Sequence, residues 1–251
     1  MANKLHTMGG NTMRLGITIL LIGSCCFADS PPQNSVEANP DDQCRIGLTF
    51  NEGSGANNWG VKEYVMLFSG SATYKASGGQ VGGAYYFNGT GNYLMESTLD
   101  RAWTSFMTSS SVWIKPNVYA QALGNVFGGG SAEWATQYGY GIQYGVGTVY
   151  AKGQNSSTDT RISAAFPNDG KWHHVAAIYT LAGKLYIDGE EVASGDLSKT
   201  WTYVFAVGAG VRYGSQPGLY FAGLIDEIIL FDRVISVAEI KELYQRGKAG
   251  Q

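Results

Sequence analysis

The fold class is decided by the stretch Asp169-Gly170-Lys171-Trp172-His173-His174-Val175-Ala176-Ala177-Ile178-Tyr179 and the one after it, Gly183-Lys184-Leu185-Tyr186-Ile187-Asp188-Gly189-Glu190. Both are short, apolar or aromatic, and bounded by Gly and Asp, the residues that favour tight turns. Asp188-Gly189 is a strong hairpin signal, and the acid of such a turn is normally solvated. The stretch therefore predicts two strands closed by short turns.

Similar segments follow one another along the rest of the chain. Residues 82–89, 111–116 and 219–231 are apolar runs bounded by Gly or Pro, and 138–144 alternate aromatic or apolar residues with Gly or Gln. About a dozen short strands at regular spacing, without intervening helices, are typical of an antiparallel sandwich. The 35 glycines and a charged fraction of 15% suit that class. We expect one all-β domain of two antiparallel sheets over residues 45–248, because such sandwiches commonly fold as single units of this length.

One helix is expected, at the C-terminal end of the chain. Ser236 is a good N-cap, and Glu239 three residues later completes a capping box. Gly247 is placed where a C-cap glycine belongs. The apolar residues that follow the helical period are Val237, Ile240, Leu243 and Tyr244. This helix is predicted to clamp one sheet or a sheet edge.

The N-terminus has the pattern of a secretory leader. Lys4 and Arg14 precede the apolar run 15–22, which is shorter than the roughly 20 residues of a membrane-spanning helix. We expect residues 1–28 to be a signal peptide and 29–44 a flexible linker. Two processing routes are open: cleavage after Ala28, or acylation of Cys25 in a lipobox-like sequence that would tether the protein to a membrane. Either route predicts a secreted or cell-surface location.

Net charge and cysteine content exclude other classes. The formal net charge is −3, so the chain lacks the basic footprint of a nucleic-acid-binding protein. Of the three cysteines, Cys25 and Cys26 lie in the leader, so a disulfide framework is not expected.

Four segments, taken in order, resemble the laminin-G-like jelly-roll family of concanavalin A-type sandwiches. They are 48–55, 83–89, 172–175 with 186–189, and 223–236 with the final helix. The resemblance covers about residues 46–247 and implies a secreted binding module. The same fold carries lectins, adhesion modules, glycoside hydrolases and lyases, so it does not name the function by itself.

The resemblance also implies a structural calcium ion. Its ligands would be the Asp226 side chain and backbone carbonyls near Glu52 and Gly83. The apolar neighbours Ile225 and Ile228 indicate burial, and a buried carboxylate without a partner is costly. Calcium takes hard oxygen ligands, including backbone carbonyls. In the alternative interpretation, Asp226 caps a turn or accepts backbone N–H bonds.

Four aromatic residues are candidates for ligand binding: Trp134, Tyr140, Tyr144 and Tyr213. Aromatic rings with exposed faces suit sugars, because the ring stacks while the polar end stays hydrated. Trp134 and Tyr213 lie in polar, Gly-rich surroundings typical of rim loops. For Tyr140 and Tyr144, the alternative is core packing.

No catalytic motif is found. A glycosidase needs two carboxylates on one face, and the adjacent pair Asp226-Glu227 would face opposite sides of a strand. Lyases of this fold usually place His, Tyr, Arg and Gln on one face, and Tyr140, Gln143, Tyr144, Arg161 and Arg212 are scattered parts of such a set. His173 and His174 also face opposite ways, which excludes a shared metal; Trp172, Tyr179 and backbone are their expected partners.

The sequence therefore predicts a non-catalytic module that binds an extracellular glycan or glycoprotein. A polysaccharide-active hydrolase or lyase is one alternative. A structural or adhesion protein of the cell surface is the other.

Overall fold

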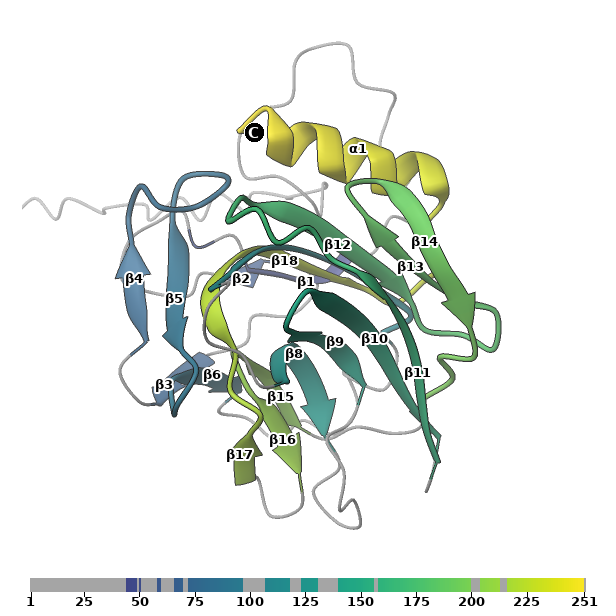
Figure 1. The fold of residues 1–251 in the computed structure, drawn as a ribbon, viewed down its shortest axis with the longest axis horizontal. Helices are drawn as coiled ribbons and strands as arrows, with labels where there is room; N and C mark the ends of the chain where they lie inside the picture. The colour runs from purple at the N-terminus through teal and green to yellow at the C-terminus, as the bar shows by residue number, and fades with distance from the viewer. Residues whose placement is uncertain are drawn as a thin grey trace, which may run out of the picture.

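The computed structural model describes residues 44–48, 50, 58–59, 66–69, 72–96, 107–117, 123–130, 140–155, 158–199, 204–212 and 216–250. The predicted leader, 1–28, and linker residues 29–43 lie outside them. The described strands form an antiparallel sandwich with a single C-terminal helix (Figure 1), so the predicted fold class is confirmed.

The first sheet has nine strands and forms the upper layer in Figure 1. Its main path runs β14-β13-β12-β7-β18-β1-β2, while β5 pairs with β18, and β4 pairs with β5. In that order, the bounds are Glu190–Gly195, Gly183–Ile187, His173–Ile178, Ser109–Pro116, Ala222–Phe231, Cys44–Leu48, Asn58–Trp59, Ala84–Asn88 and Thr73–Lys75.

The second sheet has seven strands in the order β11-β10-β9-β8-β15-β6-β3. Their bounds are Thr158–Ala165, Thr148–Asn155, Gly141–Gly145, Gly124–Gly130, Val204–Val207, Tyr93–Glu96 and Met66–Ser69. A separate hairpin of β16 (Gly210–Arg212) and β17 (Gln216–Gly218) contacts β8. Strands adjacent in sequence, such as β9-β10-β11 and β12-β13-β14, are also adjacent in space, because short turns join them.

The predicted hairpin between β13 and β14 is confirmed. Asp188 has φ 51° and Gly189 φ 83°. Positive φ at both central residues is the geometry of a type I′ turn, in which the second position favours glycine. The expected turn at Asp188-Gly189 therefore forms where the sequence placed it.

The main core lies between the two sheets and is built from the inward side chain of every second residue. On β12, Val175 and Ala177 face it, and on β9 Ile142 and Tyr144 do. Aromatic rings pack edge to face within it, such as Tyr140 with Tyr179 at 5.2 Å between centroids.

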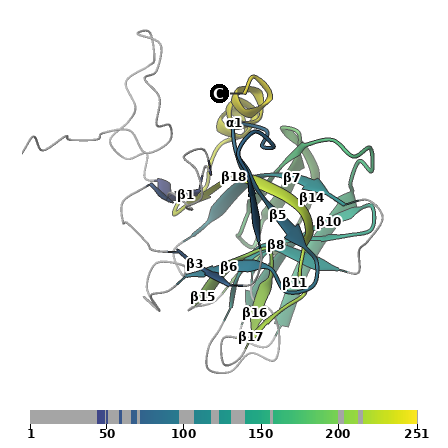
Figure 2. The ribbon, with the colours of Figure 1, turned by 90° about the vertical axis from the view of Figure 1, so that its left-hand side faces the viewer.

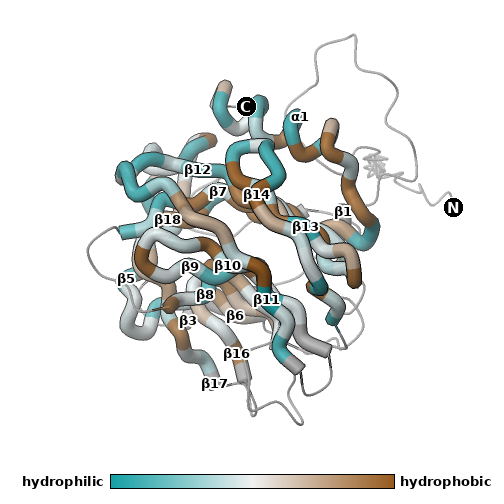
Figure 3. Tube along the Cα trace, turned by 45° about the vertical axis from the view of Figure 1, so that its right-hand side comes forward, coloured by the Kyte–Doolittle hydropathy of each residue, from teal (hydrophilic) through white to brown (hydrophobic). Residues whose placement is uncertain are grey.

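Helix α1 (Val237–Lys248) builds a second apolar layer on the outer face of the nine-stranded sheet. Ser236 and Glu239 form the predicted capping box. Figure 2 shows that α1 and the seven-stranded sheet lie on opposite sides of the nine-stranded sheet, and Figure 3 shows hydrophobic and hydrophilic residues alternating along α1. The buried residues of this layer come from β12, β13, β18, the segment that joins β18 to α1, and the helix itself: Ala176, Ile178, Tyr186, Ile229, Phe231, Ile235 and Ile240.

The prediction for Gly247 was wrong. The helix continues through Lys248, and its C-cap is Ala249. Gly247 lies inside the helix, where an added Cβ would meet Trp113 Nε1 at 2.3 Å. The position requires glycine because the helix approaches an indole ring closely there.

Candidate functional site

Asp226 lies on the outer face of the nine-stranded sheet, at an irregularity of β18. It pairs with Trp113 of β7, while Ile229 pairs with Ser111, so β18 holds one extra residue between these two pairs. The extra residue produces a β-bulge, and Glu227 within it has φ 48°. The sequence implied a regular strand in which the side chains of Asp226 and Glu227 face opposite sides. The bulge interrupts that regular alternation at this segment.

The Asp226 carboxylate is buried, with 0% of the residue exposed. The Val81 N–H donates to its Oδ2 at 3.0 Å, and the Glu227 N–H donates to its Oδ1 at 2.8 Å. Burial raises the pKa of Asp226 to about 8, although these backbone hydrogen bonds act in the opposite direction. The carboxylate thus accepts backbone bonds, as one of the two sequence interpretations expected.

The oxygen atoms around Asp226 would also suit a hard cation as ligands. An added Cβ on Gly79 would lie 2.2 Å from the Gly83 carbonyl oxygen and 2.7 Å from Asp226 Oδ2, and one on Gly83 would lie 2.3 Å from the Phe50 carbonyl oxygen. Carboxylate and carbonyl oxygens therefore gather where only glycine leaves room, and they are the ligands that calcium takes. Among the described residues, no group of three or more His, Cys, Asp or Glu side chains could hold a metal. A cation at Asp226 would therefore depend largely on carbonyl oxygens.

Of the predicted metal ligands, Asp226 and Gly83 come together. Glu52 lies outside the described residues. Phe50, two residues before it, supplies the carbonyl beside Gly83 and has φ 56°, a backbone conformation that side-chain-bearing residues rarely adopt.

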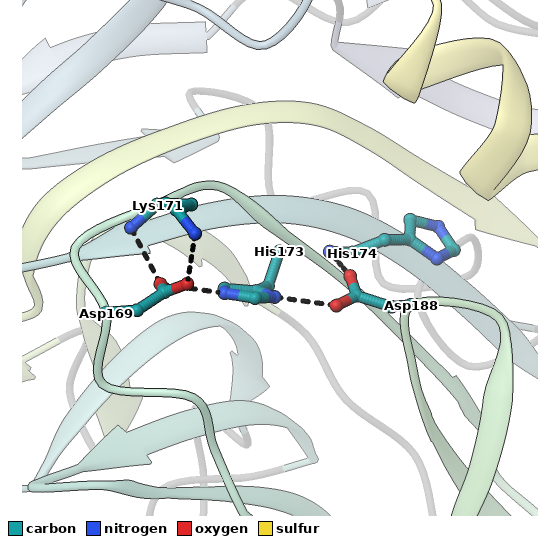
Figure 4. A network of polar contacts seen from close by, with 5 residues as sticks. All are labelled: Asp169, Lys171, His173, His174 and Asp188. Carbon is teal, nitrogen blue, oxygen red and sulfur yellow. Dashed lines mark hydrogen bonds and ion pairs between the residues drawn. The ribbon is translucent and has the colours of Figure 1, made fainter.

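The histidine pair forms a polar network at one end of β12 (Figure 4). His173 Nδ1 contacts Asp188 Oδ2 at 2.6 Å, and its Nε2 contacts Asp169 Oδ1 at 3.1 Å. An imidazole can donate from both nitrogens only when it is protonated. The hydrogen bond to Asp188, followed by the one to Asp169, raises the pKa of His173.

Asp188 also accepts a hydrogen bond from the His174 N–H at 2.9 Å. This turn acid therefore joins the hairpin to the start of β12. The expectation that it is simply solvated was wrong, because the type I′ turn directs the carboxylate back toward β12.

His174 faces the opposite side, under α1, and is fully buried. Its Nε2 contacts Ser111 Oγ at 2.7 Å, and its ring lies 5.4 Å from that of Trp113. Its Nδ1 has no hydrogen-bond partner among the described residues. Burial lowers the pKa of His174 to about 4. The two histidines do face opposite ways, as predicted, but their main partners are Asp169, Asp188 and Ser111.

The prediction that Tyr140 and Tyr144 bind a ligand is corrected by their burial. Tyr140 is 0% exposed and Tyr144 1%. Tyr140 packs on Tyr179, and Tyr144 packs on Phe166. Both rings fill the core between the sheets, because alternation along this segment directs them inward. Trp134 and Tyr213 lie outside the described residues.

Two of the scattered lyase-like residues lie on the same face of one sheet. Gln143 of β9 and Arg161 of β11 lie on the outer face of the seven-stranded sheet, opposite the side that Tyr140 and Tyr144 occupy. The side chain of Arg212 is outside the described set. The alternation of 138–144 could have placed Gln143 outward, but only strand pairing shows that Arg161 lies on the same face.

In the part of the chain that the structure describes, no helix is both long and apolar enough to cross a membrane.

The family model of the concanavalin A-like lectin/glucanase superfamily, laminin G type, matches residues 88–241. No curated protein matches the chain.

Solved structures with a similar fold include receptor-binding domains of bacterial toxins. The chain resembles the receptor-binding domain of botulinum neurotoxin C/D mosaic serotype, with 13% identity, a TM-score of 0.60 and coverage of 81% of this chain and 51% of that one. It also resembles the binding domain of botulinum neurotoxin DC in complex with rat synaptotagmin II, with 10% identity, a TM-score of 0.62 and coverage of 82% and 52%. A third similar structure is that of botulinum neurotoxin type C, whose cell entry depends on interaction with two ganglioside molecules; it has 11% identity, a TM-score of 0.60 and coverage of 82% of this chain and 51% of that one. The chain thus spans about half the length of these proteins.

Proposed function

The chain belongs to the concanavalin A-like lectin/glucanase superfamily, and we propose that it is a secreted or surface-anchored, non-catalytic module that binds an extracellular glycan or glycoprotein. The observation that carries this proposal is the family match over residues 88–241. Its neighbours in fold include a binding domain in complex with a synaptotagmin and a domain of botulinum neurotoxin type C, a toxin whose cell entry depends on two ganglioside molecules. Binding by a rigid sandwich with variable loops is a common use of such scaffolds.

A structural calcium ion at Asp226 is part of the proposal. The Asp226 carboxylate and the Gly83 carbonyl would be ligands, with further carbonyls near Phe50 and Glu52. The buried carboxylate and the adjacent carbonyls support this assignment. When bound, the cation would balance the buried negative charge and fasten the segment around Gly79–Gly83 to β18.

Trp134 and Tyr213, which have polar, Gly-rich neighbours in the sequence, remain the proposed stacking residues. Attachment to a membrane through a lipidated Cys25 remains a second mode of surface location.

The first experiment is a glycan-array screen of the purified chain, in calcium and again in EDTA. Calcium-dependent binding to a defined glycan is the expected result. Absence of binding in both conditions would contradict the glycan proposal and favour a protein partner or a structural role.

The calcium site has its own test, independent of any ligand. Calcium should raise the melting temperature of the natural protein, and Asp226→Ala should abolish that increase. Asp196→Ala is the matched control, because Asp196 is an exposed acid whose carboxylate accepts the local Ser198 N–H. An equal calcium effect in the natural protein and Asp226→Ala would contradict the site.

A further inference from the structure

We propose that the C-terminal half of α1, residues 243–248, detaches from the nine-stranded sheet when His174 beneath it becomes protonated, so that acid uncovers part of the outer face of this sheet. The inference does not depend on the ligand of the proposed function. It comes from the different contacts that hold the two halves of the helix.

The first half of α1 is held by apolar packing and an ion pair. Ile240 is fully buried in one cluster with Ile235 and Phe231. Arg233 Nη2 donates to Glu239 Oε1 at 2.6 Å. The ordinary pKa of a glutamate is about 4.3, so this pair persists in mild acid. Neither contact depends on a histidine.

The second half of α1 lies on an indole ring and an imidazole ring. The Tyr244 ring stacks on Trp113 of β7, with 5.8 Å between the centroids, and its centroid is 6.2 Å from that of His174. Gly247, one turn later, packs directly on the indole of Trp113. Gln80 Nε2 donates to the Gly247 carbonyl oxygen at 2.9 Å, which joins this end of the helix to the loop between β4 and β5. The contacts of this half therefore surround His174.

The surroundings of His174 suit only its neutral form. The residue is fully buried, and its Nε2 contacts Ser111 Oγ at 2.7 Å. Its Nδ1 has no hydrogen-bond partner within the described residues. A protonated imidazole donates from both nitrogens, so protonation would leave a buried, charged N–H group without an acceptor. Such a group is strongly unfavourable until water reaches it. The part of α1 around Tyr244 would have to move for water to enter from that side.

Other charged groups lie on the elements packed against His174. In the described structure, the titratable or charged groups on the neighbouring parts of these elements are Lys115 on β7, Asp226 and Glu227 on β18, Tyr186 on β13, Asp188 in the hairpin turn, and Lys241, Tyr244 and Lys248 on α1. Burial lowers the pKa of His174 to about 4, and the charge of Asp188 acts in the opposite direction with a smaller effect. The Asp188 carboxylate already contacts His173, on the other face of β12.

The direction of the pH effect follows from these pKa values. With α1 docked, His174 has a pKa of about 4, whereas a hydrated histidine has its ordinary value of about 6.5. The detached state therefore binds the proton first as pH falls. Docking is complete above about pH 6.5 and should weaken by about tenfold for each pH unit below it, down to about pH 4. The first half of the helix keeps its contacts, so only the second half is released.

Amide hydrogen exchange measures this opening, after correction for the pH dependence of the chemical exchange rate. Exchange at residues 244–248 should accelerate by about tenfold per pH unit between about pH 6 and pH 4.5. At each pH it should also be about tenfold or more faster than exchange in β9, β10 and at residues 240–242, because a local opening costs less than global unfolding. Equal rates in all these segments would show cooperative unfolding of the whole domain and would overturn the inference.

A titration of the natural protein tests the same proposal without a substitution. The chain contains three histidines, so the ring resonances of His174 are assignable by NMR. The ring should titrate with a midpoint below about pH 5. A midpoint near the ordinary value, while residues 244–248 stay protected from exchange, would show that the ring is hydrated beneath a docked helix. That result would also overturn the inference.

Two variants identify the source of the pH effect. In His174→Gln, exchange at residues 244–248 should no longer change with pH. His173→Gln is the matched control, because it makes the same change at the next position, on the opposite face of β12, and should keep the full pH effect. If the effect persists in His174→Gln or disappears in His173→Gln, His174 is not the group that releases the helix. If His174→Gln does not fold, the titration and the control variant still decide the question.

Discussion

The outer faces of the two sheets are used in opposite ways. On the nine-stranded sheet, α1 covers Ala176, Ile229 and Phe231, so the face becomes a second apolar core. On the seven-stranded sheet, the corresponding face holds Gln143 and Lys152, which are polar and buried. A sandwich needs only its inner faces for the main core. The outer face of the nine-stranded sheet therefore adds an apolar layer to the fold, while that of the seven-stranded sheet buries polar side chains.

The largest expected effect tests the covered face. Ile240→Ala removes the fully buried anchor of α1 and should destabilise the fold by about 2–5 kcal/mol, which lowers the melting temperature by roughly 5–15 °C. Val237→Ala on the same helix is the control, because Val237 is 46% exposed. Equal melting temperatures for the two variants would show that α1 does not stabilise this face.

The next effect is the acid sensitivity of the covered face, measured by denaturation between pH 4 and pH 8. His174 has a pKa of about 4 in the folded protein, below its ordinary value of about 6.5. The unfolded chain therefore binds the proton first as pH falls. The contribution of His174 to the free energy of unfolding should therefore fall by roughly 3 kcal/mol between pH 6.5 and pH 4, measured as the difference between the natural protein and His174→Gln.

In His174→Gln this part of the pH dependence should be absent, although the variant is less stable at pH 8 because the Ser111 contact changes. A variant that keeps the full acid sensitivity would show that His174 is not its source.

His173, on the other side of β12, should show the reverse sign. Its folded pKa is raised by Asp188 and Asp169, so its stabilising contribution is complete below about pH 6.5 and is lost as pH rises through the folded pKa. Comparison of His173→Gln with the natural protein should show a difference of about 1 kcal/mol at pH 5.5 that disappears by pH 9. A difference that is constant across this range would contradict the ion-pair account.

The smallest expected effect is on the polar face. Gln143→Leu replaces a buried amide that has an unpartnered oxygen, so the melting temperature should stay within about 2 °C of the natural value or increase. Calorimetry in the absence of glycan measures this. A loss of several kcal/mol would mean that the amide serves the fold, and the contrast between the two faces would fail.

Local sequence predicted much of the fold, because its signals act over a few residues. Asp188-Gly189 specified its turn, Ser236 and Glu239 specified the start of α1, and alternation specified that His173 and His174 face opposite ways. The same alternation places Tyr140 and Tyr144 on one face of their strand. Only the burial of both rings in the structure showed that this face is the inner one. Gly247 was misinterpreted because its neighbour, Trp113, is distant in sequence.

The candidate sites depended on contacts that no local pattern contains. The sequence by itself determined the strands, the turns, the final helix and Asp226 as a residue of interest. Only the tertiary structure brought Asp226 to the Gly83 carbonyl and joined Asp188 to His173. It likewise brought Gln143, Lys152 and Arg161, from three strands, to one face of the seven-stranded sheet. The physical reason is that turns and periodicity depend on neighbouring residues, whereas strand register and burial depend on the packing of the whole sandwich.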